Sequence, residues 1–236
     1  MAVGSYEKCK RYIESHSPGT EKTVKKRKVY PCISVSRETG AGAQAVCTEL
    51  IKILDSKSEK NENQWTYFDR QLIEKVLEDH HLPKQVSEYM VEDKFRHLSS
   101  AVNVLLGLHP SQWSLLHKTT ETVLQLARMG KVVIVGRGGN IITFKLKNAF
   151  HVRLIAPPEK RIKYIMDVQK MNRQDAETYI KKEDAARRNY LKSSFSRDIE
   201  NPELYHLVLN TGLLTHDETA AVIADSVMKK FEKLFP

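Results

Sequence analysis

The residues best suited to chemistry lie in the stretch 33–44, which reads Ile-Ser-Val-Ser-Arg-Glu-Thr-Gly-Ala-Gly-Ala-Gln. An apolar run over 29–35 predicts a buried strand before the glycines, and apolar spacing over 44–54 predicts an amphipathic helix after them. Such glycines let backbone N–H groups turn toward an anion, which the helix N-terminus also favours. Alternatively the turn is purely structural, since two glycines between a strand and a helix are common. The first interpretation predicts phosphate binding by the backbone of Thr39, Gly40, Ala41, Gly42, Ala43, Gln44 and Ala45.

The turn lacks the side chains that the phosphate-loop motif G-x-x-x-x-G-K-[ST] directs at phosphate and magnesium. With Gly42 as the second glycine, Arg37 stands at the first glycine, Ala43 at the lysine and Gln44 at the hydroxyl. One interpretation is that Arg37 supplies part of the missing charge, because a guanidinium binds two phosphate oxygens at once. The other is that Arg37 forms a surface ion pair with Glu38 or another carboxylate.

The elements that must position this turn alternate between strands and helices. Apolar and β-branched runs predict further strands over 64–69, 131–135, 151–155 and 205–210. Helical spacing predicts helices over 115–129, 159–192 and 217–231. This alternation is typical of an α/β domain with a parallel sheet and right-handed crossovers. Ligands in such folds bind outside the carboxyl ends of the strands, where Asp69, Arg70 and Arg137 are also expected.

Composition and charge narrow the class of partner. The 236 residues carry a net charge of +9, which favours anionic partners such as nucleotides, nucleic acid or a membrane surface. Three cysteines without a C-x-x-C pair argue against a disulfide framework or a zinc site and favour free thiols in a reducing compartment. No run approaches the ~18 apolar residues of a membrane-spanning helix. We therefore expect a cytoplasmic protein that does not associate with membranes.

The chain is expected to divide into an N-terminal helix with a basic linker over 1–28 and a main domain over 29–236. The basic run 21–28 is interpreted as a solvated linker, because it lacks the aromatic residues that stack on bases, so a nucleic-acid partner is not favoured. The N-terminal helix lies outside the main domain and is a candidate contact of a homo-oligomer.

Four stretches, in this order and spacing, resemble the cytidylate kinase-like family, a branch of the P-loop nucleoside monophosphate kinases. They are 33–42, 67–70, 134–138, and 182–190 leading to 204–211. The resemblance covers residues 28 to 232. It implies a three-layer, P-loop NTPase-like parallel sheet flanked by helices, with a helical acceptor-binding insert at 70–115 and a helical lid at 170–198.

The resemblance implies an ATP-dependent nucleoside monophosphate kinase, cytidylate-like, that binds Mg²⁺ together with ATP. True cytidylate kinases end the loop with Gly-Ala-Gly-Lys-Gly-Thr, whereas residues 40–45 here read Gly-Ala-Gly-Ala-Gln-Ala. Magnesium would then need Asp69, Thr39, Ser36, or mostly water and phosphate as ligands. Because the lysine and hydroxyl are missing, the alternative is a kinase-like nucleotide sensor that binds but turns over little.

For the acceptor monophosphate, the resemblance implies a site formed by Asp69, Arg70 and Arg137. The residues themselves allow another role for Asp69, which could cap the N-terminus of a helix over 70–79. Arg137 follows the most apolar predicted strand and lies between glycines, so its charge must reach solvent or a ligand.

For the lid, the resemblance implies that Arg187 and Arg188, together with Arg37, act in catalysis. Arginines delivered by a closing lid neutralise the charge on a transferred phosphoryl group. The other interpretation of Arg187 and Arg188 is a solvated basic helix face. Asp184 lies three residues before Arg187, which places it to orient that arginine along the helix.

Overall fold

The computed structural model describes residues 29–58, 64–69 and 110–235, within which five strands form one sheet. The strands are β1 (Cys32–Arg37), β2 (Thr66–Phe68), β3 (Val132–Val135), β4 (Ala149–Ile155) and β5 (Leu207–Asn210). The helices are α2 (Ala43–Ser56), α6 (Pro110–Met129), α7 (Gly139–Ile142), α8 (Pro158–Gln169), α9 (Arg173–Phe195) and α10 (His216–Lys230), with 3-10 turns η1 (Pro202–Leu204) and η2 (Glu232–Leu234). The predicted N-terminal helix, Arg70 and nearly all of the predicted insert lie outside the described residues.

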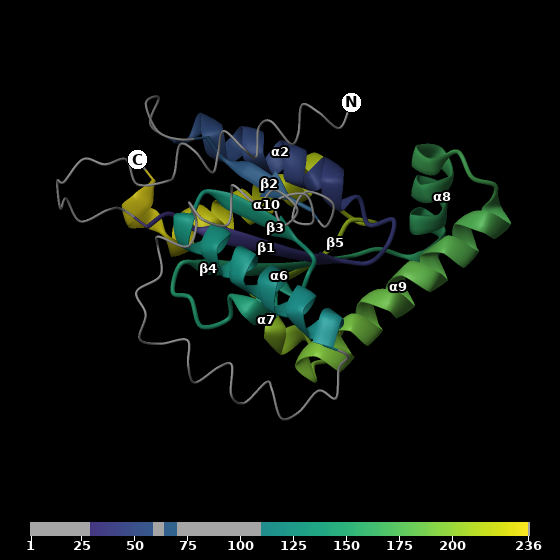
Figure 1. Ribbon diagram of the computed structural model, residues 1–236. Coiled ribbons are helices and arrows are strands. Elements are labelled where there is room, and N and C mark those ends of the chain that lie inside the picture. Colours follow the sequence, from purple (N-terminus) through teal and green to yellow (C-terminus); the bar gives the residue numbers. More distant parts are fainter. Residues whose placement is uncertain (1–28, 59–63, 70–109, 236) are drawn as a thin grey trace.

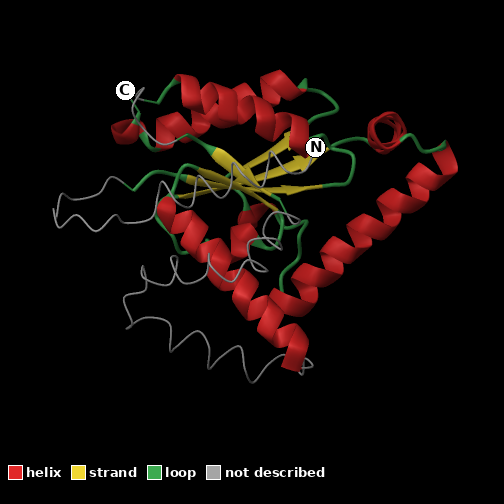
Figure 2. Cartoon of the chain, turned by 45° about the horizontal axis from the view of Figure 1, so that its top comes forward, coloured by secondary structure: helices red, strands yellow, loops and turns green. Residues whose placement is uncertain are grey.

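The sheet has the strand order β2-β3-β1-β4-β5, and every neighbouring pair is parallel. Helices cover both of its faces, as Figures 1 and 2 show. α2 and α10 lie on one face, around a core that includes Ile33 and Val35 of β1. α6 and α7 lie on the other, against Val132 and Ile134 of β3. This all-parallel three-layer arrangement confirms the predicted α/β fold class.

β1 begins and ends later than its apolar run predicted. The strand continues to Arg37, because Ser36 and Arg37 still pair with Arg153 and Leu154 of β4. An apolar pattern does not reveal that polar residues at the end of a strand continue its backbone pairing. Arg37 is therefore the last residue of β1 and does not belong to the glycine turn.

The basic stretch predicted as one helix over 159–192 is two helices. α8 ends at Gln169 because Lys170 adopts a left-handed conformation with φ 56°. Asn172 then caps α9, its side chain accepting a hydrogen bond from the backbone amide of Asp175. The two helices share a small apolar core that includes Ile165 and Ile180. α9 runs from this core back toward α7, so that it bridges the α8 lobe and the sheet (Figure 1).

Two cysteines lie in the described part of the chain, and both are buried free thiols, as predicted. Burial raises the pKa of the Cys47 thiol to about 12, so the thiol stays protonated at neutral pH. Trp65 is also buried. Among the described helices, none is both long and apolar enough to cross a bilayer.

Candidate functional site

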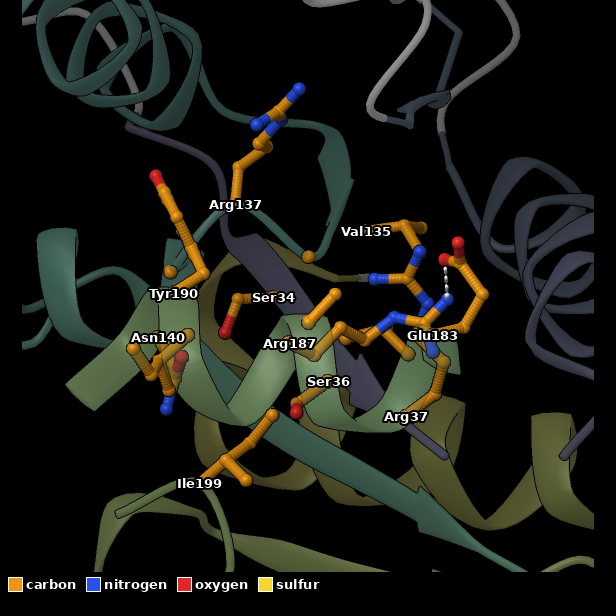
Figure 3. Close-up of a pocket in the computed structure, with 15 residues that line it drawn as sticks. Ser34, Ser36, Arg37, Val135, Arg137, Asn140, Glu183, Arg187, Tyr190 and Ile199 are labelled. Carbon is orange, nitrogen blue, oxygen red and sulfur yellow. Dashed lines mark hydrogen bonds and ion pairs between the residues drawn. The ribbon is translucent and has the colours of Figure 1, made fainter. Parts of the chain in front are cut away.

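A cavity of about 300 Å³ lies at the carboxyl ends of β1 and β3, and α9 forms one of its walls (Figure 3). This is the edge at which parallel α/β sheets bind ligands. The polar and charged side chains that line it come from β1, from the turn and short helix after β3, and from α9. They include Ser34, Arg37, Arg137, Asn140, Glu183 and Arg187.

Arg37 points from the end of β1 toward the end of β3, where its guanidinium lies against Gly136, in space that a Cβ at that position would need. The pKa of Arg37 is lowered to about 10, first because burial penalises its charged form and second because Arg187 is nearby. Asp69 and Glu183 oppose this effect but are weaker. Arg37 thus stays charged at neutral pH, next to a second arginine, in a setting that favours an anion.

The interpretation of Arg37 as the ion-pair partner of Glu38 is wrong. The carboxylate of Glu38 instead accepts a hydrogen bond from the backbone amide of Ala156 at 3.0 Å and pairs with Arg161 Nε at 3.6 Å. Because β1 extends through Arg37, the two side chains leave the backbone in opposite directions. The interpretation of Arg37 as replacement charge remains a prediction.

Arg137 sits in a turn with three consecutive left-handed residues. Its φ is 53°, between 83° at Gly136 and 67° at Gly138. A non-glycine residue costs roughly 1 kcal/mol in this conformation, which persists only where the surrounding structure demands it. The turn directs Arg137 to the cavity, with its Cζ 6.0 Å from the centre of the Tyr190 ring. The predicted position of Arg137 at the end of a strand is confirmed, and its role toward an acceptor remains a prediction.

The turn after β1 is tied to α8 and α9 by a group of four residues that we call the Asp184 cluster: Thr39, Arg161, Asp184 and Arg187. One oxygen of Asp184 accepts from the Thr39 amide at 2.8 Å and from the Thr39 hydroxyl at 2.6 Å. The other accepts from Arg161 Nη1 at 2.6 Å. Arg187 donates to Asp184 at 3.1 Å and to the Thr39 hydroxyl. The predicted contact between Asp184 and Arg187 is therefore confirmed.

These hydrogen bonds hold Asp184 ionised. Burial by itself would raise the pKa of this carboxyl, but the bonds from Thr39 and Arg161 together outweigh it, and the pKa falls below its ordinary value. The carboxylate thus takes, on the Thr39 amide, the position that a phosphate oxygen would take at a glycine turn.

The two glycines of the turn are in contact with other helices. Gly40 has φ 84°, and a Cβ there would lie 2.6 Å from the carbonyl oxygen of Arg161. Gly42 has φ 71°, and a Cβ there would overlap the imidazole of His216. α2 begins at Ala43 without a side-chain cap, which leaves its N-terminus suited to an anion. Phosphate binding by residues 39–45 remains a prediction.

The oxygens near the turn do not fit a protein-held magnesium ion. The Ser36 hydroxyl accepts from Arg153 Nη1 at 3.1 Å and lies 3.3 Å from the hydroxyl of Tyr205, while that of Thr39 is engaged in the Asp184 cluster. Within 29–58, 64–69 and 110–235, no group of three or more acidic, histidine or cysteine side chains is placed to hold a metal.

The remaining predicted residues lie apart from the cavity or outside the described residues. Arg188 is exposed on α9 and pairs with Glu200 at 3.6 Å, so a catalytic role for it stays a prediction. Asp69 directly follows β2 and is near enough to favour the charged form of Arg37. Arg70 lies outside the described residues.

Sequence reasoning missed the neutral residues of the cavity. Ser34 alternates with apolar neighbours on β1, and its hydroxyl lies 2.9 Å from Nδ1 of His151 on β4. That alternation was a usable signal, because polar residues are uncommon in a central parallel strand. Asn140, on α7, and Tyr190, on α9, belong to no motif that would have identified them.

Comparison with known proteins identifies a family model, described as the Cytidylate kinase-like family, that matches residues 32–213. An uncharacterized protein from Eubacterium ventriosum has a similar structure, with a TM-score of 0.66 at 16% identity over 84% of this chain and 98% of that chain. This likeness concerns the fold alone.

Two weaker likenesses carry no argument about function. Shikimate kinase from Acinetobacter baumannii, solved with shikimate, has a TM-score of 0.46 at 15% identity over 86% of this chain and 95% of that chain. A uronate isomerase from Corynebacterium glutamicum is 24% identical over 114 residues, which are 48% of this chain and only 22% of the length of that protein.

Proposed function

This chain belongs to the cytidylate kinase-like family, and we propose that it transfers a phosphoryl group from ATP to a nucleoside monophosphate. The observation that carries the proposal is the cavity at the ends of β1 and β3, which Arg37, Arg137 and Arg187 all line. Ligand pockets span roughly 300–1,000 Å³, and this cavity is at the lower end of that range. It therefore suits one monophosphate and leaves the triphosphate to the glycine turn.

In the proposed reaction an oxygen of the acceptor phosphate forms a bond to the γ-phosphorus of ATP. The bond between that phosphorus and the β–γ bridging oxygen breaks, and ADP leaves with the electron pair. Such a transfer needs positioning and charge neutralisation and no covalent intermediate. Arg37 and Arg137 would hold the acceptor phosphate through charge-assisted hydrogen bonds.

Arg187 is placed to serve both substrates. Its guanidinium lines the cavity and also donates to the hydroxyl of Thr39, at the start of the glycine turn. A cation between an acceptor in the cavity and a donor at the turn would neutralise charge on the phosphoryl group as it passes. This position supports Arg187, rather than the exposed Arg188, as the arginine that replaces the missing lysine.

A second function is favoured because the protein's own side chains already occupy the glycine turn. Asp184 already occupies the Thr39 amide, and Gly40 and Gly42 are covered by Arg161 and His216. A turn filled by the protein's own groups suits a kinase-like sensor that binds a nucleotide in the cavity and transfers nothing.

Measurements of ADP release and of monophosphate binding, both with the full chain, distinguish the two functions. ATP and Mg²⁺ are supplied with CMP, UMP, AMP or GMP, and the affinity of each monophosphate is measured by calorimetry. The kinase requires one monophosphate to stimulate ADP release, and the Arg187→Ala variant to lose that stimulation. Binding without stimulation supports the sensor. If no monophosphate binds, both functions are wrong.

A further inference from the structure

Another arginine lies behind the cavity, on the central strand β4. Arg153 pairs in register with Ser36 of β1, and its side chain is only 6% exposed. Its neighbours along the strand, Val152 and Leu154, belong to the core on the α2 side of the sheet. Side chains alternate between the two faces of a strand, so Arg153 lies on the opposite face, together with Ser36. A charged residue is unusual there, because the faces of a parallel sheet are normally apolar.

Arg153 has neutral groups around its buried charge. Its Nη1 donates a hydrogen bond to the Ser36 hydroxyl at 3.1 Å, and its Cζ lies 5.9 Å from the centre of the Tyr205 ring. In the described part of the chain no carboxylate forms an ion pair with it, whereas the partly buried Arg161 has Asp184 at 2.6 Å. A buried charge without an opposite charge destabilises the folded protein. An anion bound nearby would remove this cost.

Ser36 connects Arg153 to the cavity. Its side chain lines the cavity (Figure 3), and its oxygen accepts the hydrogen bond from Arg153. The Tyr205 hydroxyl donates to the carbonyl oxygen of Ile199 at 2.8 Å and lies 3.3 Å from Ser36 Oγ, which is long for a bond between two hydroxyl groups. The hydroxyl proton of Ser36 is therefore available to an acceptor in the cavity. A charged donor on the serine oxygen makes that hydroxyl a stronger hydrogen-bond donor.

We propose that Arg153 is a positioning residue for a phosphate group in the cavity. Ser36 donates a hydrogen bond to a phosphate oxygen, and the charge of Arg153 behind it is balanced by the bound anion. The inference rests on the proposed function only in placing a phosphate group in the cavity. It adds an arginine that acts through a serine to those that line the cavity themselves. The protein's affinity for phosphate should therefore depend on the charge of a residue that phosphate does not touch.

The test compares Arg153→Met and Arg153→Lys with wild type in the full chain. Calorimetry measures the affinity for inorganic phosphate, in buffer free of other phosphate and of sulfate. Methionine fills the space of the arginine stem without its charge. Arg153→Met should bind phosphate about tenfold more weakly, at the low end of the effect of a hydrogen bond to a charged group. Arg153→Lys keeps the positive charge and should stay within about threefold of wild type.

Ser36→Ala tests the connection between Arg153 and the cavity. It should also weaken phosphate binding, and the double variant with Arg153→Met should lose clearly less affinity than the two single losses combined, because both substitutions remove the same connection. Arg173→Met is the matched control. Arg173 is exposed on α9 and pairs with Glu159 at 2.7 Å, so its replacement should leave the phosphate affinity unchanged.

The proposal is wrong if Arg153→Met keeps the phosphate affinity of wild type. It is also wrong if Arg153→Lys binds as weakly as Arg153→Met, since the charge then plays no part, or if the losses from Ser36→Ala and Arg153→Met simply add. Arg153→Gln, which is neutral but keeps a donor for Ser36, takes the place of Arg153→Met if that variant does not fold.

The kinase reaction is measured separately, by ADP release from the wild type. It stands if Arg153→Met binds phosphate normally, and the role of Arg153 stands if phosphate binding depends on its charge but no monophosphate stimulates ADP release. If the wild type binds neither inorganic phosphate nor any monophosphate, the role of Arg153 and the proposed function are both wrong.

Discussion

Asp184 on α9 accepts hydrogen bonds from both the amide and the hydroxyl of Thr39, 145 positions away in the chain. The contact joins the glycine turn after β1 to the helix that forms one wall of the cavity. Two guanidinium groups, those of Arg161 and Arg187, share the same carboxylate. A nucleotide that binds at the turn must therefore replace Asp184 or rearrange the arginines around it.

We expect Asp184→Asn to bind ATP more tightly than wild type while unfolding at a lower temperature. The substitution removes the negative charge that competes with phosphate. It also takes one carboxylate partner from each of two partly buried arginines, Arg161 and Arg187, which destabilises the folded state. Calorimetry with ATP and thermal unfolding measure the two effects. Asp167→Asn, on the exposed side of α8, is the control. Weaker ATP binding would mean that Asp184 positions the arginines for the nucleotide.

We expect Arg37→Ala to weaken monophosphate binding by about 10- to 100-fold. This is the loss of affinity expected when one hydrogen bond to a charged group, with a free energy of roughly 1.5–3 kcal/mol, is removed. Arg37→Lys should recover only part of this, because an ammonium lacks the two-pronged geometry of guanidinium. Titration calorimetry with the monophosphate measures the affinities. Arg173→Ala removes an exposed arginine from α9 and should change nothing. Equal affinities for Arg37→Ala and wild type would make Arg37 a purely structural residue.

Alanine at Gly40 should destabilise the protein more than alanine at Gly136. Both glycines have positive φ, so each substitution carries a conformational cost of roughly 1–2 kcal/mol. At Gly40 the new methyl group would meet the backbone of Arg161, which cannot move without shifting α8. At Gly136 it would meet only the end of the Arg37 side chain, which can turn away.

Chemical denaturation of the two glycine variants gives the comparison. Gly136→Ala should also bind the monophosphate less well, because it displaces the guanidinium of Arg37. If Gly136→Ala proves the less stable variant, or keeps full affinity, the position assigned to Arg37 is wrong.

The free energy of unfolding should fall as the pH drops from about 6.5 to 4. The pKa of His151 is lowered from 6.5 to about 4, first by burial and then by His206 and Lys230 nearby. Between these values the unfolded chain binds a proton that the folded chain does not, so acid favours unfolding. The free energy of unfolding decreases by at most about 3 kcal/mol by pH 4, and His151 causes no further decrease below pH 4.

Urea unfolding at a series of pH values, with wild type and His151→Asn, measures this dependence. The variant should lack the part of the slope that lies between pH 4 and 6.5. Parallel curves for the two proteins would show that His151 is not kept neutral by the fold.

The fold was predictable because its signals are local. The runs over 131–135 and 205–210 are apolar enough to predict strands, which the structure places at Val132–Val135 and Leu207–Asn210. The signals failed where a boundary has no local mark. Lys170 ends α8 in a left-handed conformation without a glycine or proline to announce it, and Arg37 extends β1 although it is charged.

The candidate site was predictable only in part. Arg37, Arg137 and Arg187 were identified one by one, from a motif position, a glycine turn and a resemblance. Their common cavity depends on how β1, β3 and α9 are arranged. Asn140 has no sequence signal at all, since an asparagine after two glycines looks like any other residue of a turn.

The sequence by itself determined the alternation of strands and helices, the glycine turn and the excess of positive charge, because apolar spacing, backbone freedom and composition are properties of neighbouring residues. Only the tertiary structure decided that Asp184 holds Thr39, that Arg37 lies beside Arg187 and that Asn140 borders the same cavity. These pairs are far apart in the chain, and they meet because the parallel crossovers bring the carboxyl ends of β1 and β3 together and carry α9 past them.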